Sequence, residues 1–199
     1  MKSNIRLTMT ALLLTFAVAA NARFNAANTD APTTYFGLRA GIGASMYSNI
    51  DDAVALATPI GGVAMGFKLA KVPIYLELSA LYMNMGSKVK ARSDYYSHHL
   101  DESFTINNHS LMVPIVATYR FYLNDHITLE PFTGFYGSYG FSGKKGDFGL
   151  REGVAFTFSH LYVNVGANIG FVSQDRDEKD FWLKDGHHAS LFLGVGLNF

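Results

Sequence analysis

Large apolar residues and small residues alternate with a period of two along most of this chain. In the first such segment, residues 36–46, Phe36 and Ile42 occupy one parity, whereas Gly37 and Arg39 occupy the other. A period of two is the side-chain repeat of a β-strand with two different faces. The pattern predicts eight strands, near residues 36–46, 63–69, 74–82, 111–121, 127–139, 150–158, 161–171 and 191–199.

The connections between the predicted strands alternate between short and long. Short turns are expected at residues 70–73, 123–126 and 158–160, and long polar loops at residues 49–58, 87–103, 142–152 and 173–188. This alternation places all the long loops at one end of an up-and-down antiparallel sheet. Eight such strands remove their exposed edges by closing on themselves. The sequence therefore predicts an all-β fold, an eight-stranded antiparallel barrel.

The five charges within the cores of the predicted strands indicate which face meets lipid. All of them share the parity of the small residues: Arg39, Lys68, Glu77, Arg120 and Glu130. A soluble barrel needs charges on its outer face, whereas a lipid-facing Arg or Lys at the bilayer midplane costs about 2–4 kcal/mol. We therefore expect a transmembrane barrel whose charges line a lumen filled by side chains, without a continuous pore. A soluble lipocalin-like barrel is the alternative.

Aromatic residues gather near both ends of the predicted strands, as in the girdles of membrane barrels. Those at the short-turn end are Tyr35, Phe36, Phe67, Tyr119, Phe121 and Phe199, and those toward the loops are Tyr82, Tyr139, Phe141 and Phe171.

Two features depart from the regular alternation of a closed barrel. Leu81, Met83 and Met85 have the inner parity, which indicates either a partly apolar interior near the loops or a bulge. Each of Pro59, Pro114 and Pro131 predicts a bulge, a strand end or a missing bond.

Residues 1–22 are typical of a secretory signal peptide. Lys2 and Arg6 precede an apolar stretch that is too short to span a bilayer, and the sequence Ala-Asn-Ala ends at Ala22. We expect cleavage after Ala22, a flexible lead-in over residues 23–33 and a barrel domain over residues 34–199. The mature chain is then exported, and the barrel is expected in the outer membrane of a Gram-negative cell, with a periplasmic N-terminus and extracellular long loops.

Composition excludes several classes of function. Lys and Arg number 16, as do Asp and Glu, so no charge excess favours nucleic-acid binding. The absence of cysteine removes disulfides, thiolate metal sites and a cysteine nucleophile. No cofactor is predicted.

Several stretches resemble the PorT-like family of outer-membrane β-barrels. Residues 111–121 look like the fourth-strand signature of that family, although Met112 stands where the family often has an acid. Residues 147–150 with Gly153, the run from Leu161 to Val163, and Glu77 with Leu78 and Tyr82 resemble its other strands. The general plan is similar to that of the small OmpX-like and OmpA-like barrels. The resemblance implies a barrel fold and, as a functional alternative, an accessory role in protein secretion.

The C-terminus is similar to the signal that outer-membrane assembly machinery reads on its substrates. The residues that carry this similarity are Gly194, Leu197 and the terminal Phe199, and Leu193 departs from the polar residue usual at its position. Assembly machinery is therefore one expected partner, together with outer-membrane lipids and lipopolysaccharide. No nucleic acid is expected to bind, and the chain is expected to be a monomer.

Sites for chemistry are sparse. The pairs His98–His99 and His187–His188 fall in predicted loops, where solvated polar groups are expected rather than a metal site. Only His109 with Ser110, downstream of Glu102, suggests a nucleophilic cluster. Five loop cations could contact lipopolysaccharide phosphates: Lys88, Lys90, Arg92, Lys144 and Lys145. Phe181 and Trp182 form a candidate contact patch beside the mixed-charge run 175–180.

The prediction is therefore a non-enzymatic barrel with a structural or surface-interaction role through its long loops. The alternatives are an accessory of secretion across the outer membrane and a lipid-modifying barrel enzyme.

Overall fold

The computed structural model describes residues 33–48, 53–69, 72–91, 102–124, 126–142, 144–173 and 186–199. The predicted signal peptide, the cleavage site at Ala22 and the lead-in up to residue 32 lie outside these residues. No helix in the described part of the chain is long and apolar enough to cross a membrane.

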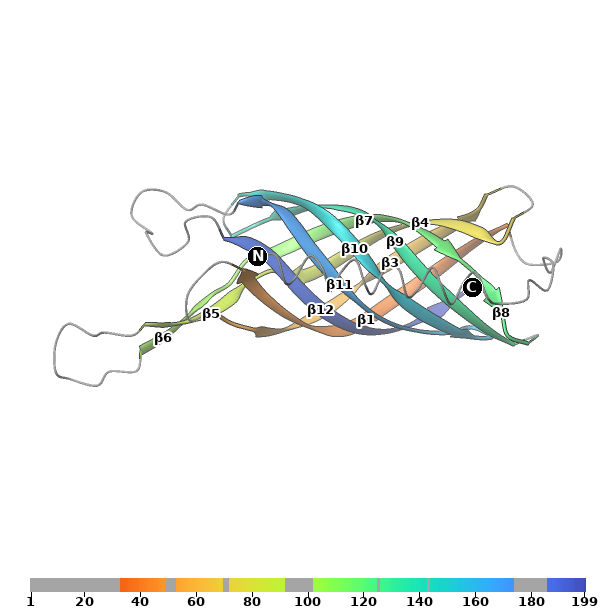
Figure 1. Ribbon diagram of the computed structural model, residues 1–199, viewed down its shortest axis with the longest axis horizontal. Coiled ribbons are helices and arrows are strands. Elements are labelled where there is room, and N and C mark those ends of the chain that lie inside the picture. Colours follow the sequence, from red (N-terminus) through yellow and green to blue (C-terminus); the bar gives the residue numbers. More distant parts are fainter. Residues whose placement is uncertain are drawn as a thin grey trace, which may run out of the picture.

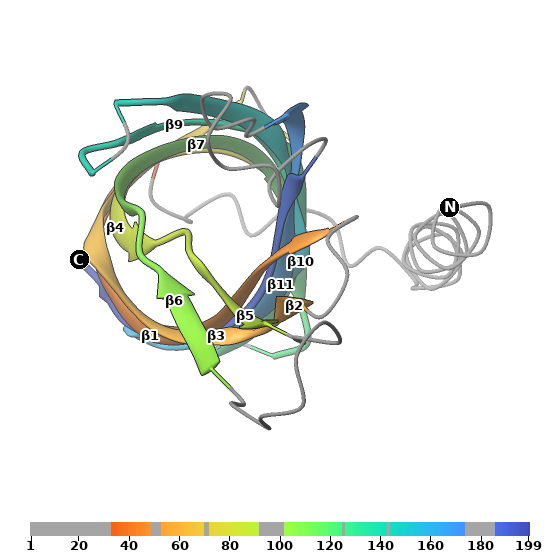
Figure 2. The ribbon, with the colours of Figure 1, turned by 90° about the vertical axis from the view of Figure 1, so that its left-hand side faces the viewer.

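The fold is a closed barrel of eight antiparallel strands, as the sequence predicted. The strands are β1 (Thr34–Ser48), β3 (Leu56–Lys68), β4 (Ile74–Asn84), β7 (His109–Tyr119), β9 (Ile127–Gly140), β10 (Gly146–Phe158), β11 (Leu161–Ser173) and β12 (His187–Asn198). Each pairs with the next in chain order, and β12 pairs with β1 to complete the ring (Figure 2). The strands are tilted to the long axis of the molecule (Figure 1), as closure of a barrel requires.

Short connections lie at one end of the barrel. Leu69 N donates to Ile74 O between β3 and β4, and Leu123 N donates to Ile127 O before β9. The short strand β8 (Phe121–Tyr122) continues β7 after Arg120 and also pairs with β9. The C-terminus lies at this same end (Figure 1).

At the opposite end, a small sheet extends beyond the barrel. It consists of β2 (Ala53–Val54), β5 (Ser87–Ala91) and β6 (Glu102–Ile106), in the order β2-β5-β6. Figure 1 shows β5 and β6 projecting past the rim.

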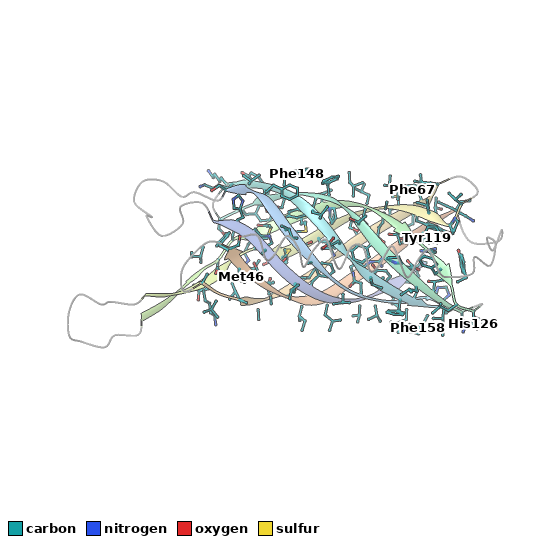
Figure 3. The ribbon with its side chains drawn as sticks, viewed as in Figure 1. Met46, Phe67, Tyr119, His126, Phe148 and Phe158 are labelled. Carbon is teal, nitrogen blue, oxygen red and sulfur yellow. The ribbon has the colours of Figure 1, made fainter. Side chains whose placement is uncertain are left out.

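Side chains alternate between the lumen and the outer face. On β1, Tyr35 and Ser45 are buried, whereas Leu38 and Ile42 are more than half exposed. Glycines make room for large lumenal side chains: a Cβ on Gly66 would overlap the Tyr35 ring. Figure 3 shows Phe67, Tyr119 and Phe158 around the short-turn end, and Phe148 on the outside toward the loops.

The interior near the loops is partly apolar, without a bulge in β4. Leu81, Met83 and Met85 pack with Met112 and Tyr136 in a buried cluster. The β4–β7 register runs unshifted from Ile74–Tyr119 to Asn84–His109, so the first of the two sequence interpretations is correct. The three prolines also lie within strands of unshifted register, opposite Ile42, Tyr136 and Val154.

Several predicted loop boundaries were wrong because strands continue into polar sequence. The strand after the first loop begins at Leu56, not Val63, and the last strand begins at His187. Residues 87–91 and 102–103, expected as loop, belong to β5 and β6. A further difference is at residues 142–152, where β10 already begins at Gly146. In each case backbone pairing with a neighbouring strand outweighs the local polar composition.

Candidate functional site

The polar lumen is the candidate site, and four of the five charges predicted to line it are buried there. Arg39 Nη2 lies 2.9 Å from Glu77 Oε2, and Arg120 Nε lies 3.2 Å from Glu130 Oε1. The second contact is an ion pair without hydrogen-bond alignment, because Arg120 Nε has no acceptor in line. Lys68, the fifth residue, is half-buried at the end of β3, near the short turns.

Tyrosines and small polar groups complete the surroundings of Glu77. The Tyr35 hydroxyl donates to Glu77 Oε2 at 2.5 Å, and Ser79 Oγ donates to Oε1 at 3.0 Å. On the other side, Arg39 Nη1 donates to Asn198 Oδ1 at 2.8 Å. The carboxylate thus accepts three hydrogen bonds from three different groups, counting the one from Arg39. A charged carboxylate can remain buried when its oxygens accept hydrogen bonds in this way.

Aromatic rings cover the faces of the guanidinium groups. Arg39 Cζ lies 4.0 Å from the centroid of the Tyr162 ring, and Arg120 Cζ lies 3.9 Å from that of Tyr75. These cation–π contacts stabilise cations that are shielded from water. The short-turn half of the lumen is therefore filled by charges that are matched by opposite charges and rings.

The β10 charges were missed as lumenal groups because residues 142–152 were expected to form a loop. Asp147 and Arg151 are buried and point inward. Arg151 Nη1 donates to Asn168 Oδ1 at 2.8 Å, and its guanidinium lies 3.9 Å from the Phe192 ring centroid. The parity that Asp147 and Arg151 share with Ala155 could have revealed the longer strand.

A cavity of about 30 Å³ lies at mid-lumen, lined among others by Arg39, Glu77 and Arg151. It has room for one or two water molecules.

The expectation of a solvated loop was wrong for His188. This histidine is on β12 and 1% exposed. Its Nε2 lies 3.2 Å from Ser45 Oγ, and its Nδ1 lies 3.4 Å from the hydroxyl of Tyr136. Tyr136 in turn donates to Asp147 Oδ2 at 2.7 Å. Four strands, β1, β9, β10 and β12, thus bring one polar network together at the loop end of the lumen.

This network has the residue types of a hydrolase triad but not its working arrangement. Ser45 has no exposed surface, and its hydroxyl donates to the Gly86 carbonyl at 2.8 Å. The His188 Nδ1 and Asp147 Oδ2 atoms are 3.9 Å apart, beyond hydrogen-bond length. A nucleophile needs a free hydroxyl that faces substrate. In this geometry the network instead fastens segment 85–86 to the wall, together with the bond from Tyr47 to the Met85 carbonyl at 2.9 Å.

His109 and Ser110 do not form a catalytic pair. His109 is exposed on the outer face, where its Nδ1 lies 2.7 Å from the Tyr82 hydroxyl. Ser110 is buried in the lumen and donates to the Asn108 carbonyl at 2.9 Å. Adjacent residues of a strand point to opposite faces, and this separates the two side chains.

The remaining candidates are only partly described. Lys88 and Lys144 are exposed at the loop end. Arg92, His98, His99, the run 175–180, Phe181 and Trp182 lie outside the described residues. Within the described part of the chain, no three His, Cys, Asp or Glu side chains come close enough to hold a metal ion. At the C-terminus, Leu197 and Phe199 are exposed on the outer face, whereas Gly194 packs against Asn164.

Comparison with known proteins shows similarity only to solved structures. No family model and no curated protein sequence matches the chain. The outer membrane enzyme PagL is 17% identical with a TM-score of 0.49, over 80% of this chain and 97% of its own. Neisserial surface protein A is 12% identical, with a TM-score of 0.47, over 84% and 98%. Ail of Yersinia pestis, in complex with a heparin analogue, is 13% identical, with a TM-score of 0.44, over 84% and 100%.

Proposed function

We propose that this chain is an integral outer-membrane β-barrel protein that makes contacts at the cell surface through its loop end. One observation carries the membrane assignment: each of the eight strands has exposed large apolar side chains on its outer face, while most charges of the barrel wall face the lumen. Leu38 and Ile42 on β1, and Leu191 and Leu193 on β12, are each more than half exposed. An apolar surface on this scale is a liability in water, but it fits a lipid environment.

Membrane insertion is tested by fractionation and by gel mobility. Expression with the native N-terminal segment should place the protein in the outer-membrane fraction, and unheated samples should migrate differently from boiled ones. Recovery in the soluble periplasm would contradict the proposal.

The surface-contact role is supported by the sheet formed by β2, β5 and β6. It extends beyond the rim (Figure 1), and β6 pairs only with β5 among the described residues. A strand with an open edge can receive an extended partner segment through main-chain hydrogen bonds. The open edge of β6 therefore favours a contact element. A lipid-modifying enzyme is less well supported, because His109 and Ser110 would need to share a face and they lie on opposite faces of β7.

Replacement of residues 88–105 by a short Gly-Ser turn tests this role. We expect the barrel to remain heat-modifiable, while cells lose adhesion or envelope resistance that the intact protein provides. In the matched control, residues 124–126 of the short turn before β9 are replaced by Gly and Ser. This variant should keep both the heat-modifiable migration and the adhesion or envelope resistance of the cells. A secretion accessory instead predicts that deletion of the whole protein stops export of secreted proteins, and that outcome would replace the surface-contact role.

A further inference from the structure

Glu152 is a carboxyl group on the outer face of the barrel wall. Side chains on β10 alternate, with Asp147 and Arg151 buried in the lumen and Phe148 and Phe156 exposed outside. Glu152 shares the parity of the phenylalanines and is partly exposed, and one of its oxygens, Oε2, is covered by neighbouring atoms of the same chain and has no hydrogen-bond partner there. In the sequence, Glu152 falls where the predicted loop 142–152 overlaps the predicted strand 150–158.

Its position is also central in depth. On β10, Phe148 lies four residues from Glu152 on the side of the loops, and Phe156 lies four residues from it on the side of the short turns. Four residues correspond to about 13 Å along a strand, so the carboxyl lies between the two aromatic zones. If the barrel is inserted as proposed above, this group is in the hydrocarbon layer, where an unsatisfied polar group is costly.

Hydrocarbon favours the neutral form of a carboxyl group. A protonated carboxyl has one donor and one acceptor side by side, so its best complement is another protonated carboxyl. Two copies inserted in the same direction hold this group at the same depth, and a two-fold axis along the membrane normal can bring the two groups together. The neighbours in register, Thr133 on β9 and Ala167 on β11, are small enough to let two walls approach.

We propose that the β9–β10–β11 wall is a homodimer interface, in which Glu152 of one copy pairs with Glu152 of a second. This replaces the expectation of a monomer. The inference rests on membrane insertion but not on the surface-contact role. If the protein shows heat-modifiable migration in vesicles but does not dimerise, the homodimer proposal is wrong while the proposal of membrane insertion stands.

The natural absence of cysteine allows a matched cross-linking test. Val154→Cys places a thiol on β10 beside Glu152, and Val63→Cys places one on β3, opposite β10 in the ring. Both variants are reconstituted in phosphatidylcholine vesicles at a low ratio of protein to lipid, and their heat-modifiable migration is checked. They are then treated with a short bis-methanethiosulfonate cross-linker. We expect cross-linked dimer for Val154→Cys and only background for Val63→Cys.

Substitution of Glu152 separates carboxyl pairing from random contact. In the Val154→Cys background, Glu152→Leu should lower the yield of dimer about tenfold, whereas Glu152→Gln should retain most of it, because an amide also donates and accepts. Sedimentation equilibrium of the unsubstituted chain in density-matched micelles gives an independent measure of dimer. Equal cross-linking at both cysteine positions, an unchanged yield with Glu152→Leu, or a purely monomeric unsubstituted chain would overturn the proposal.

Discussion

The two halves of the lumen are filled by different chemistry. Next to the short turns, two arginines pair with Glu77 and Glu130, and tyrosine rings cover the guanidinium groups. Next to the loops, three methionines and a leucine pack around Tyr136, beside the network of Ser45 and His188. The first half depends on matched charges, whereas the second depends on packed volume and on a hydrogen-bond network that ends at the carboxyl of Asp147. The two should therefore fail differently when a single side chain is removed.

The largest effect is expected at the Arg39–Glu77 pair. Glu77→Leu leaves Arg39 buried without its carboxylate and removes the acceptor of Tyr35 and Ser79. The loss in the free energy of unfolding should be about 3–5 kcal/mol, measured by urea denaturation of the barrel in lipid vesicles. The double variant Arg39→Met with Glu77→Leu should recover part of this loss, because no unpaired charge remains. A double variant less stable than Glu77→Leu would show that charge matching does not govern this half.

The loop half should respond to lost volume instead. Met112 has no exposed surface and packs in the apolar cluster, so Met112→Ala should cost about 2–5 kcal/mol of unfolding free energy by leaving a cavity. Met65→Ala is the control, because Met65 is half-exposed on the outer face of β3 and lipid chains can fill the space. Equal losses at the two sites would mean that the lumen near the loops is not tightly packed.

The sequence could predict the face of each strand but not how far each strand extends. Parity alone placed Arg39 and Glu77 on the inner face, since alternation is a local property of the backbone. It missed Asp147, Arg151 and His188, because their surroundings are as polar as a loop and only pairing with β9, β11 and β1 makes them strand. The partners across the lumen, such as His188 with Ser45, depend on barrel closure, which no local pattern encodes.

A smaller effect is expected from Tyr136→Phe. The change removes the hydroxyl that donates to Asp147 Oδ2 at 2.7 Å, and it leaves this buried carboxyl with two backbone donors, the Phe148 amide at 2.9 Å and the Val172 amide. Loss of a hydrogen bond to a buried charged group should cost about 1.5–3 kcal/mol in the same denaturation assay. Tyr139→Phe is the control, because Tyr139 is exposed on the same strand. A loss no greater than that of the control would show that Asp147 gains nothing from Tyr136.

The smallest effect is expected for a hydrogen bond of the same length on the outer face. The Tyr82 hydroxyl lies 2.7 Å from His109 Nδ1, and the two rings stack with centroids 6.0 Å apart. Tyr82→Phe keeps the stacked ring, and water at the loop-end rim can replace the lost partner of His109. The unfolding free energy should therefore change by less than about 0.5 kcal/mol. Because this bond matches the Tyr136–Asp147 bond in length but differs in exposure and in the charge of its acceptor, the difference between the two variants measures what burial and charge add. A Tyr82→Phe loss as large as that of Tyr136→Phe would show that the outer rim is as shielded from water as the lumen.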